Sequence, residues 1–243
     1  MRGIVVTGAS SGIGRATALR FLEAGWRVGL IARRAEALEE IAGRHGAAVP
    51  LPCDVTDAGA LDAAMDAFAG AGRLGAVFAN AGGGLGAALP DEVSPEEFRR
   101  VIDVNVTGVF LTARAAFRIM RAQSPQGGRI ILNGSLSAHA PRPGSIAYTA
   151  SKHAVSGLTK TLALDGRPFG IDAGQIDVGN AATAITERMR EGVRQADGAV
   201  RPEPLMDVGI VADAVLHMAS LPEGANVLSM TVMASAAPFV GRG

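Results

Sequence analysis

Short apolar runs alternate along the chain with longer segments in which apolar residues recur every three or four positions. The short runs are rich in Val, Ile and Leu and predict strands, whereas the longer spacing predicts helices. The expected strands cover residues 3–8, 26–33, 47–55, 74–82, 127–135, 170–178 and 226–233. The expected helices cover residues 13–25, 35–46, 57–72, 95–123, 148–166 and 207–220. This alternation predicts an α/β fold, in which about seven strands form a parallel sheet flanked by helices on both faces.

The domain organisation follows from the same pattern. No Pro/Ser linker, internal repeat or low-complexity tract divides the sequence, and α/β folds of 243 residues often form one domain. We therefore expect residues 1–243 to be a single domain. The least regular long stretch is 178–206, which has several glycines and two prolines and is a candidate lid.

Composition and charge narrow the function classes. Lys plus Arg equals Asp plus Glu at 23 each, and no basic block stands out, so a nucleic-acid partner is not expected. The single cysteine, Cys53, fits a reducing compartment, and the N-terminus does not read as a signal peptide. Glycines and charges interrupt the apolar runs before they reach a membrane span. We expect a cytoplasmic protein with no membrane partner.

A glycine-rich turn, "TGASSGIG" at Thr7–Gly14, joins the first strand to the first helix. Gly8, Gly12 and Gly14 carry no side chain where the backbone must turn sharply and approach a ligand. The helix that follows directs its free N–H groups and positive dipole end toward a pyrophosphate. An ordinary glycine turn is the alternative, but the position after the first strand favours a dinucleotide site.

The only tyrosine, Tyr148, stands four residues before Lys152 in a segment that reads as the start of a helix. A free phenol has a pKa of about 10, and a cation one helical turn away favours the phenolate. The pair predicts a proton donor and acceptor tuned by its neighbour. A surface tyrosine beside a snorkelling lysine is the alternative.

Further motifs follow in a fixed order: "CDVTD" at 53–57, "NAG" at 80–82, "NVTG" at 105–108, Ser135 thirteen residues before the tyrosine, and "YTASK" at 148–152. Together with TGxxxGxG, they resemble the short-chain dehydrogenase/reductase family over nearly the whole chain. The resemblance implies a Rossmann-type doubly wound sheet, a nicotinamide cofactor, and hydride exchange with a carbonyl or an alcohol. It also implies that Lys152 hydrogen-bonds the nicotinamide ribose.

The candidate residues fall into two groups. The catalytic candidates are Asn105, Ser135, Tyr148 and Lys152. The cofactor-binding candidates are Gly8, Ser10, Ser11, Gly12, Ile13, Gly14, Arg33, Asp54, Val55, Asn80, Ala81, Gly82, Tyr148, Lys152, Val178, Gly179 and Thr183. The four histidines have no metal-site spacing, so no metal is expected.

Several of these residues have competing interpretations. Ser137 is the rival of Ser135 for orienting the substrate oxygen, and either hydroxyl could instead stabilise a turn. Asn105 is a helix-contact amide or, by resemblance, marks a helix kink whose freed carbonyl holds a water leading to Lys152. Asp54 could cap the next helix or accept from the adenine amine. His139 and Arg142, between Ser135 and Tyr148, could face the substrate.

The residues at the end of the second expected strand indicate which cofactor, NADP(H) or NAD(H), is preferred. Ala32 lacks the carboxylate that would accept from both ribose hydroxyls, and Arg33 offers a planar fork suited to phosphate. These residues predict NADP(H) rather than NAD(H). The alternative is that Arg33 and Arg34 are a solvated pair at the start of a helix.

Two segments depart from the family pattern. Val178 replaces the usual proline after the sixth strand, whereas Gly179 and Thr183 keep their places, so the lid is expected to begin on a different backbone path. The chain ends in "MASAAPFVGRG", in which Phe239 and Val240 could dock on a neighbouring subunit or form a frayed tail.

We therefore expect an NADP(H)-dependent carbonyl reductase or alcohol dehydrogenase acting on a small molecule. By resemblance, it pairs into a homodimer or homotetramer through the helices at 95–123 and 148–166. A dinucleotide-binding sensor or scaffold without turnover is the alternative. Relatives that carry out dehalogenation lose the glycine turn and replace the lysine with arginine, and neither change is present here.

Overall fold

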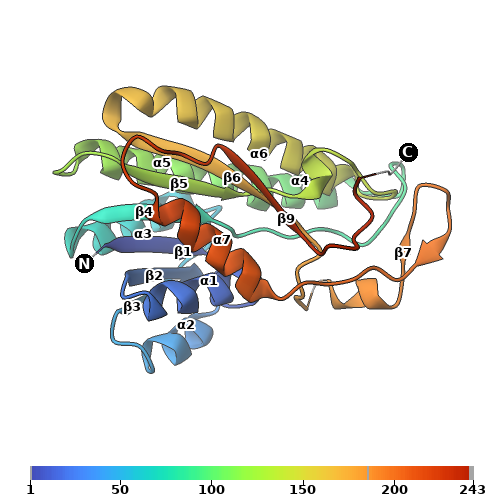
Figure 1. Ribbon diagram of the computed structural model, residues 1–243, viewed down its shortest axis with the longest axis horizontal. Coiled ribbons are helices and arrows are strands. Elements are labelled where there is room, and N and C mark those ends of the chain that lie inside the picture. Colours follow the sequence, from blue (N-terminus) through green and yellow to red (C-terminus); the bar gives the residue numbers. More distant parts are fainter. Residues whose placement is uncertain (1, 185, 241–243) are drawn as a thin grey trace.

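Strand β1 lies near the middle of one parallel sheet in this computed structural model, which describes residues 2–184 and 186–240 (Figure 1). The strand order is β3-β2-β1-β4-β5-β6-β9. The strands are β1 (Gly3–Thr7), β2 (Arg27–Ala32), β3 (Ala48–Pro52), β4 (Leu74–Ala79), β5 (Gly128–Asn133), β6 (Ile171–Gly179) and β9 (Ser229–Met233). The predicted seven-stranded, doubly wound sheet is confirmed. The order reverses between β1 and β4, where such sheets form a crevice at the carboxyl ends of their strands.

Helices cover both faces of the sheet (Figure 1). Helices α1 (Gly12–Glu23), α2 (Ala35–Ala42) and α7 (Val208–Ser220) bury their apolar residues with Ile4 and Val6 of β1. Helices α3 (Ala58–Gly70), α5 (Gly108–Ala122) and α6 (Ile146–Asp165) do so with Val5, on the opposite face. Because side chains alternate along a strand, β1 contributes to both cores and is buried at all five positions.

The helix expected at 95–123 is three segments rather than one. Helix α4 (Pro95–Ile102) begins with a capping box between Ser94 and Glu97 and ends in a π-helical turn (Asp103–Thr107), and α5 follows without a break. A π turn inserts a residue into the helical ladder and often marks a functional site. Asn105 lies inside this turn, so a local distortion of the helix is present where the kink was expected.

The expected lid at 178–206 begins two residues inside strand β6, because Val178 and Gly179 still pair with Val232 and Met233 of β9. Beyond the strand, the chain forms a 3₁₀ turn (Glu187–Arg190) and a hairpin of β7 (Val193–Arg194) and β8 (Val200–Arg201). Figure 1 shows this hairpin projecting from one end of the sheet. Residue 185 of the lid and residues 241–243 of the tail lie outside the described residues. Within the described part of the chain, no helix has the length and apolar character needed to cross a membrane.

Candidate functional site

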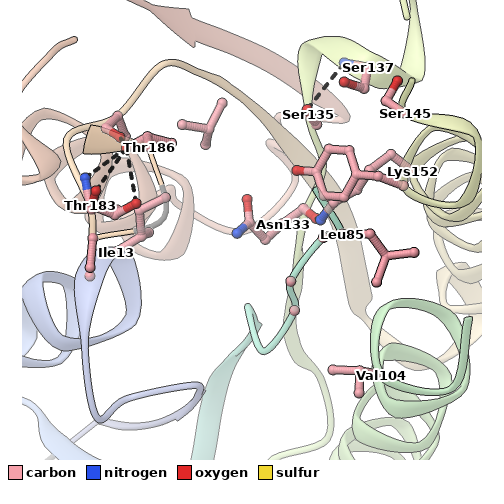
Figure 2. Close-up of a pocket in the computed structure, with 18 of the residues that line it drawn as sticks. Ile13, Leu85, Val104, Asn133, Ser135, Ser137, Ser145, Lys152, Thr183 and Thr186 are labelled. Atoms are coloured by element: carbon pink, nitrogen blue, oxygen red, sulfur yellow. Dashed lines mark hydrogen bonds between the residues drawn. The ribbon is translucent and has the colours of Figure 1, made fainter. Parts of the chain in front are cut away.

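A cavity of about 1030 Å³ opens at the carboxyl ends of the strands. It is lined by the turn after β1, the ends of β4, β5 and β6, the start of α6 and the lid. Every predicted site residue lines it except Asn105. Figure 2 shows Ser135, Asn133 and Lys152 on one side of this space, with Ile13, Thr183 and Thr186 across from them.

The glycine turn forms a cradle that larger residues would fill. Gly8 and Gly12 have φ values of +70° and +52°, which other residues rarely adopt. A Cβ on Gly14 would lie 2.3 Å from the carbonyl oxygen of Gly8. Ser11 precedes α1 without capping it through its side chain, and Gly12, Ile13 and Gly14 of the first turn line the cavity. The uncapped N–H groups of such a turn are a typical site for an anion.

Thr7 and two asparagines connect the ends of three neighbouring strands. The Thr7 hydroxyl accepts from the N–H groups of Asn80 at 2.9 Å and Ala81 at 3.0 Å, which ties the start of the turn to the end of β4. Asn80 donates to the Thr7 carbonyl at 2.9 Å and accepts from Asn133 Nδ2 at 2.9 Å. Asn133 Oδ1 is buried and has no hydrogen-bond partner among the described residues. The glycine cradle and this unsatisfied acceptor beside it fit a bound dinucleotide, which offers phosphates and amide donors.

Lys152 and Tyr148 lie one turn apart on α6. The ammonium of Lys152 is nearly buried, donates to the carbonyl of Asn133 at 2.7 Å, and lies 5.5 Å from the centre of the Tyr148 ring. The surface-lysine alternative is therefore wrong, because a residue that is 4% exposed is not snorkelling. The contact with Asn133 holds the cation between the tyrosine ring and the end of β5.

Ser135 follows strand β5 and begins a 3₁₀ turn (Leu136–Ala138). Its hydroxyl accepts from the Ser137 N–H at 3.1 Å, so the turn-stabilising role applies to Ser135 itself (Figure 2). The hydroxyl hydrogen stays available to a substrate oxygen, because the bond uses a lone pair. Ser137 also lines the cavity, and the two serines remain candidates on position alone.

Asn105 acts from behind the cavity wall. Its side chain is 1% exposed, accepts from the N–H of Gly83 at 2.9 Å, and donates to the Gly83 carbonyl at 2.8 Å. It also donates to Ser151 Oγ on α6 at 3.0 Å. The helix-contact role is thus present: one amide joins the π turn, the loop after β4 and the helix of Tyr148. The water path toward Lys152 stays a prediction.

Charged and polar groups surround the end of the cavity that lies next to strands β2 and β3. Arg33 is 80% exposed and lies 3.9 Å from Asp54, while Arg34 donates to the Ser10 carbonyl and hydroxyl at 3.3 and 3.1 Å. Hydrogen bonds from Thr56, with help from Arg33, lower the pKa of Asp54. Asp57, rather than Asp54, caps α3 by accepting from the Ala60 N–H. The capping interpretation of Asp54 is therefore wrong.

The lid is fixed to the loop that precedes Tyr148. Arg142 donates to Glu203 at 2.5 Å and to Asn180 at 2.9 Å, and the Glu203 carboxylate also accepts from Gln195 at 2.9 Å. Arg142 lines the cavity, as expected for a residue facing a substrate, whereas His139 is not among the lining residues. Thr183 lies against the glycine turn, where a Cβ on Gly12 would be 3.2 Å from its methyl group.

Phe239, near the end of the described residues, contacts the loop after strand β5 of the same chain. The Phe239 ring packs edge-on toward His139 with 6.4 Å between ring centres, whereas Val240 is 90% exposed. Docking on a neighbouring subunit stays a prediction. The described residues contain no His/Cys/Asp/Glu cluster able to hold a metal ion.

Sequence reasoning missed Asn133, Asp177 and Glu203. Asp177 and Gln175 form a polar pair at alternate, buried positions of strand β6, and that pattern was a visible signal. Asn133 had only its place at a strand end to mark it. Glu203 lies between two prolines in the irregular lid, and no local pattern marks it.

Comparisons with known proteins agree with this architecture. The family model described as short chain dehydrogenase matches residues 2–194. The 2-(R)-hydroxypropyl-CoM dehydrogenase of Xanthobacter autotrophicus is 36% identical over 88% of this chain and 90% of its own. Sulfoacetaldehyde reductase 2 of Chromohalobacter salexigens is 32% identical over 95% of this chain and 93% of its own.

Solved structures give the same result. A 3-ketoacyl-(acyl-carrier-protein) reductase from Brucella melitensis, complexed with NADH, has a TM-score of 0.85 at 27% identity, covering 95% of this chain and 96% of its own. An alcohol dehydrogenase from Thermococcus sibiricus, complexed with 5-hydroxy-NADP, has a TM-score of 0.82 at 26% identity, covering 96% of each chain. The chain is an oxidoreductase of the short-chain dehydrogenase/reductase family, which binds a nicotinamide dinucleotide.

Proposed function

We propose that this protein interconverts a carbonyl and an alcohol with NADP(H), using Tyr148 as general acid and base. The observation that carries the proposal is the placement of Ser135, Tyr148 and Lys152 on the wall of one cavity that also contains the glycine cradle. A nicotinamide dinucleotide, when bound, supplies or accepts the hydride.

Each side chain has a defined task in this proposal. Tyr148 donates a proton to the carbonyl oxygen as negative charge develops there, and removes it in the reverse direction. The Lys152 ammonium, 5.5 Å from the ring centre, favours the phenolate that this transfer leaves. Ser135 donates a hydrogen bond that orients the substrate oxygen. Asn105 positions the loop at Gly83 and, through Ser151, the helix that carries Tyr148.

The cofactor would lie along the strand ends. The Gly8–Gly14 turn and the start of α1 would hold the pyrophosphate, and Asp54 with Val55 would flank the adenine. Asn80, Ala81 and Gly82 would form one wall, and Val178, Gly179 and Thr183 the other. Lys152 would reach the nicotinamide ribose, and Arg33 the 2′-phosphate.

We also propose that residues 1–243 work as one domain, that the lid closes over the nicotinamide, and that subunits pair into a homodimer or homotetramer through α5 and α6. Exposed apolar side chains on these helices, Phe110 at 47% and Leu164 at 58%, fit such pairing. The substrate is a small carbonyl or alcohol compound.

Two variants test the acid–base assignment. Tyr148→Phe removes the proton donor and keeps the ring, so kcat should fall by about 10²–10⁴-fold while the Kd for NADPH stays nearly unchanged. Lys152→Met should lose rate and also weaken cofactor binding, because the ribose contact goes with the ammonium. The assay is NADPH oxidation with a panel of ketones, aldehydes and sugars. Tight NADPH binding without turnover of any of them would contradict the proposed enzyme and favour a sensor.

Arg33→Ala tests the cofactor preference. A charge-assisted hydrogen bond contributes about 1.5–3 kcal/mol, which corresponds to roughly ten- to a hundredfold in affinity. NADPH should bind tighter than NADH by that factor, and the variant should lose most of the difference. The measurement is both dissociation constants by cofactor fluorescence. Equal affinities in the unmodified protein would mean that the exposed Arg33 guanidinium serves no phosphate.

A further inference from the structure

The carboxylate of Asp177 lies fully buried behind the candidate serine, Ser135. Asp177, on strand β6, has no exposed surface, and burying a charge is costly unless donors surround it. Its Oδ1 accepts from the Ser135 N–H at 2.8 Å and from Gln175 Nε2 at 2.6 Å. Its Oδ2 contacts His139 Nε2 at 2.9 Å. Three donors therefore hold one carboxylate in place.

Two of these donors come from opposite ends of one turn. Ser135 begins the 3₁₀ turn Leu136–Ala138, and His139 directly follows it. The Asp177 carboxylate contacts both ends and so fixes the turn that carries the Ser135 hydroxyl. Its position also depends on Gly134, because a Cβ there would lie 2.0 Å from Asp177 Oδ1.

The same network extends to the helix of the tyrosine. Gln175 Nε2 donates to Ser156 Oγ at 3.1 Å, and its Oε1 accepts from Thr159 Oγ1 at 3.2 Å. Ser156 and Thr159 lie on α6, downstream of Tyr148 and Lys152. One chain of hydrogen bonds thus joins the turn of Ser135 to the helix of Tyr148 through strand β6.

From these contacts we infer that Asp177 is a positioning residue: with His139 and Gln175, it sets where the Ser135 hydroxyl lies relative to Tyr148. This inference rests on the proposed function for its catalytic consequence, but the fixing of the turn does not depend on the reaction. His139 is not among the residues that line the cavity, so in this role it acts through Asp177.

Asp177→Asn tests the inference, because an amide nitrogen must face one of the donors and displace it. We expect kcat to fall by about ten- to a hundredfold, the value of one hydrogen bond to a charged group, with an unchanged Kd for NADPH. In a Ser135→Ala background the same substitution should cost almost nothing further, because the hydroxyl it positions is gone. An equal fall in both backgrounds would overturn the inference.

Controls separate positioning from general damage and from failure of the proposed function. Asp172→Asn makes the same change on the same strand, where Asp172 pairs with Arg129, and should leave kcat unchanged. Should Asp177→Asn fail to fold, His139→Ala should show the same dependence on Ser135, and His139→Gln, which keeps an N–H donor, should restore part of the rate. Hydrogen exchange of the 134–140 segment should accelerate in Asp177→Asn even if no substrate is ever turned over. Unchanged exchange there would overturn the inference by itself.

Discussion

The ion pair between Arg142 and Glu203 leads us to a prediction about the stability of the lid, which can be tested without any substrate. Glu203→Gln keeps the shape of the side chain and removes its charge. The Glu203 side chain is 1% exposed and that of Arg142 is 17% exposed. Removing one partner of a buried pair costs about 3–5 kcal/mol, because the remaining charge loses its buried counter-charge. The lid is the segment that loses this stabilisation.

The stability that the lid loses can be measured from the amide hydrogen exchange of residues 189–206. A loss of 3–5 kcal/mol in the free energy of local opening accelerates exchange by at least about a hundredfold. Strand β1, at the sheet centre, should show little change. The acceleration should also be seen without any cofactor, which separates it from effects on binding.

The lid itself contains a matched control. Arg201 and Asp197 form an ion pair at 2.6 Å, similar in length to the 2.5 Å contact of Arg142 and Glu203, but their side chains are 58% and 54% exposed. Water screens such a pair, so Asp197→Asn should leave lid exchange close to that of the unmodified protein. If both variants changed exchange equally, or Glu203→Gln changed it less than tenfold, the argument from burial would be refuted.

Two more predictions follow from the cavity and the turn. Burial, together with Asp54 and Asp57, raises the pKa of the Cys53 thiol, so alkylation of Cys53 should keep accelerating at alkaline pH values where that of an exposed thiol has levelled off. NADPH should slow this alkylation, because Cys53 lines the cavity. Mass spectrometry measures both effects, and a lack of protection by NADPH would contradict the cofactor placement. Gly134→Ala should lower the free energy of unfolding by about 1–3 kcal/mol, because the added methyl group clashes with Asp177. Gly70→Ala, which has open space around it in α3, should raise the free energy of unfolding by up to about 1 kcal/mol. Equal melting temperatures for the two variants would contradict this prediction.

Much of the fold could be predicted because buried apolar residues recur at regular intervals along the sequence. Strand β1 is buried on both faces and therefore reads as a continuous apolar run, and the glycines of the next turn mark where its end meets the cavity. The cavity residues were found for a related reason. In a parallel sheet, the ends of successive strands meet at one edge, so Thr7, Asn80 and Ser135 had to lie close together.

The π turn at Asp103–Thr107 shows one limit of this reasoning. Inserting a residue into the ladder leaves the apolar spacing intact on either side, so the pattern reads as one helix from 95 to 123. Only Asn105, a mediocre helix former, hinted at the distortion. Its partners, Gly83 and Ser151, are 22 and 46 residues away in sequence, and no local pattern could have named them.

The buried carboxylates show a second limit. Asp177 meets its donors Ser135 and His139 at separations of 42 and 38 residues, and Glu203 meets Arg142 at 61. Both acids hold the same loop, one near its start and the other near its end, and this loop joins the candidate serine to the candidate tyrosine. A loop tied at both ends by buried charges cannot adapt much to its ligand, because each movement would strip a charge of its partners. We therefore expect selectivity to come from the fixed shape of the cavity around Ser135 and Tyr148, with adaptation confined to the hairpin of β7 and β8.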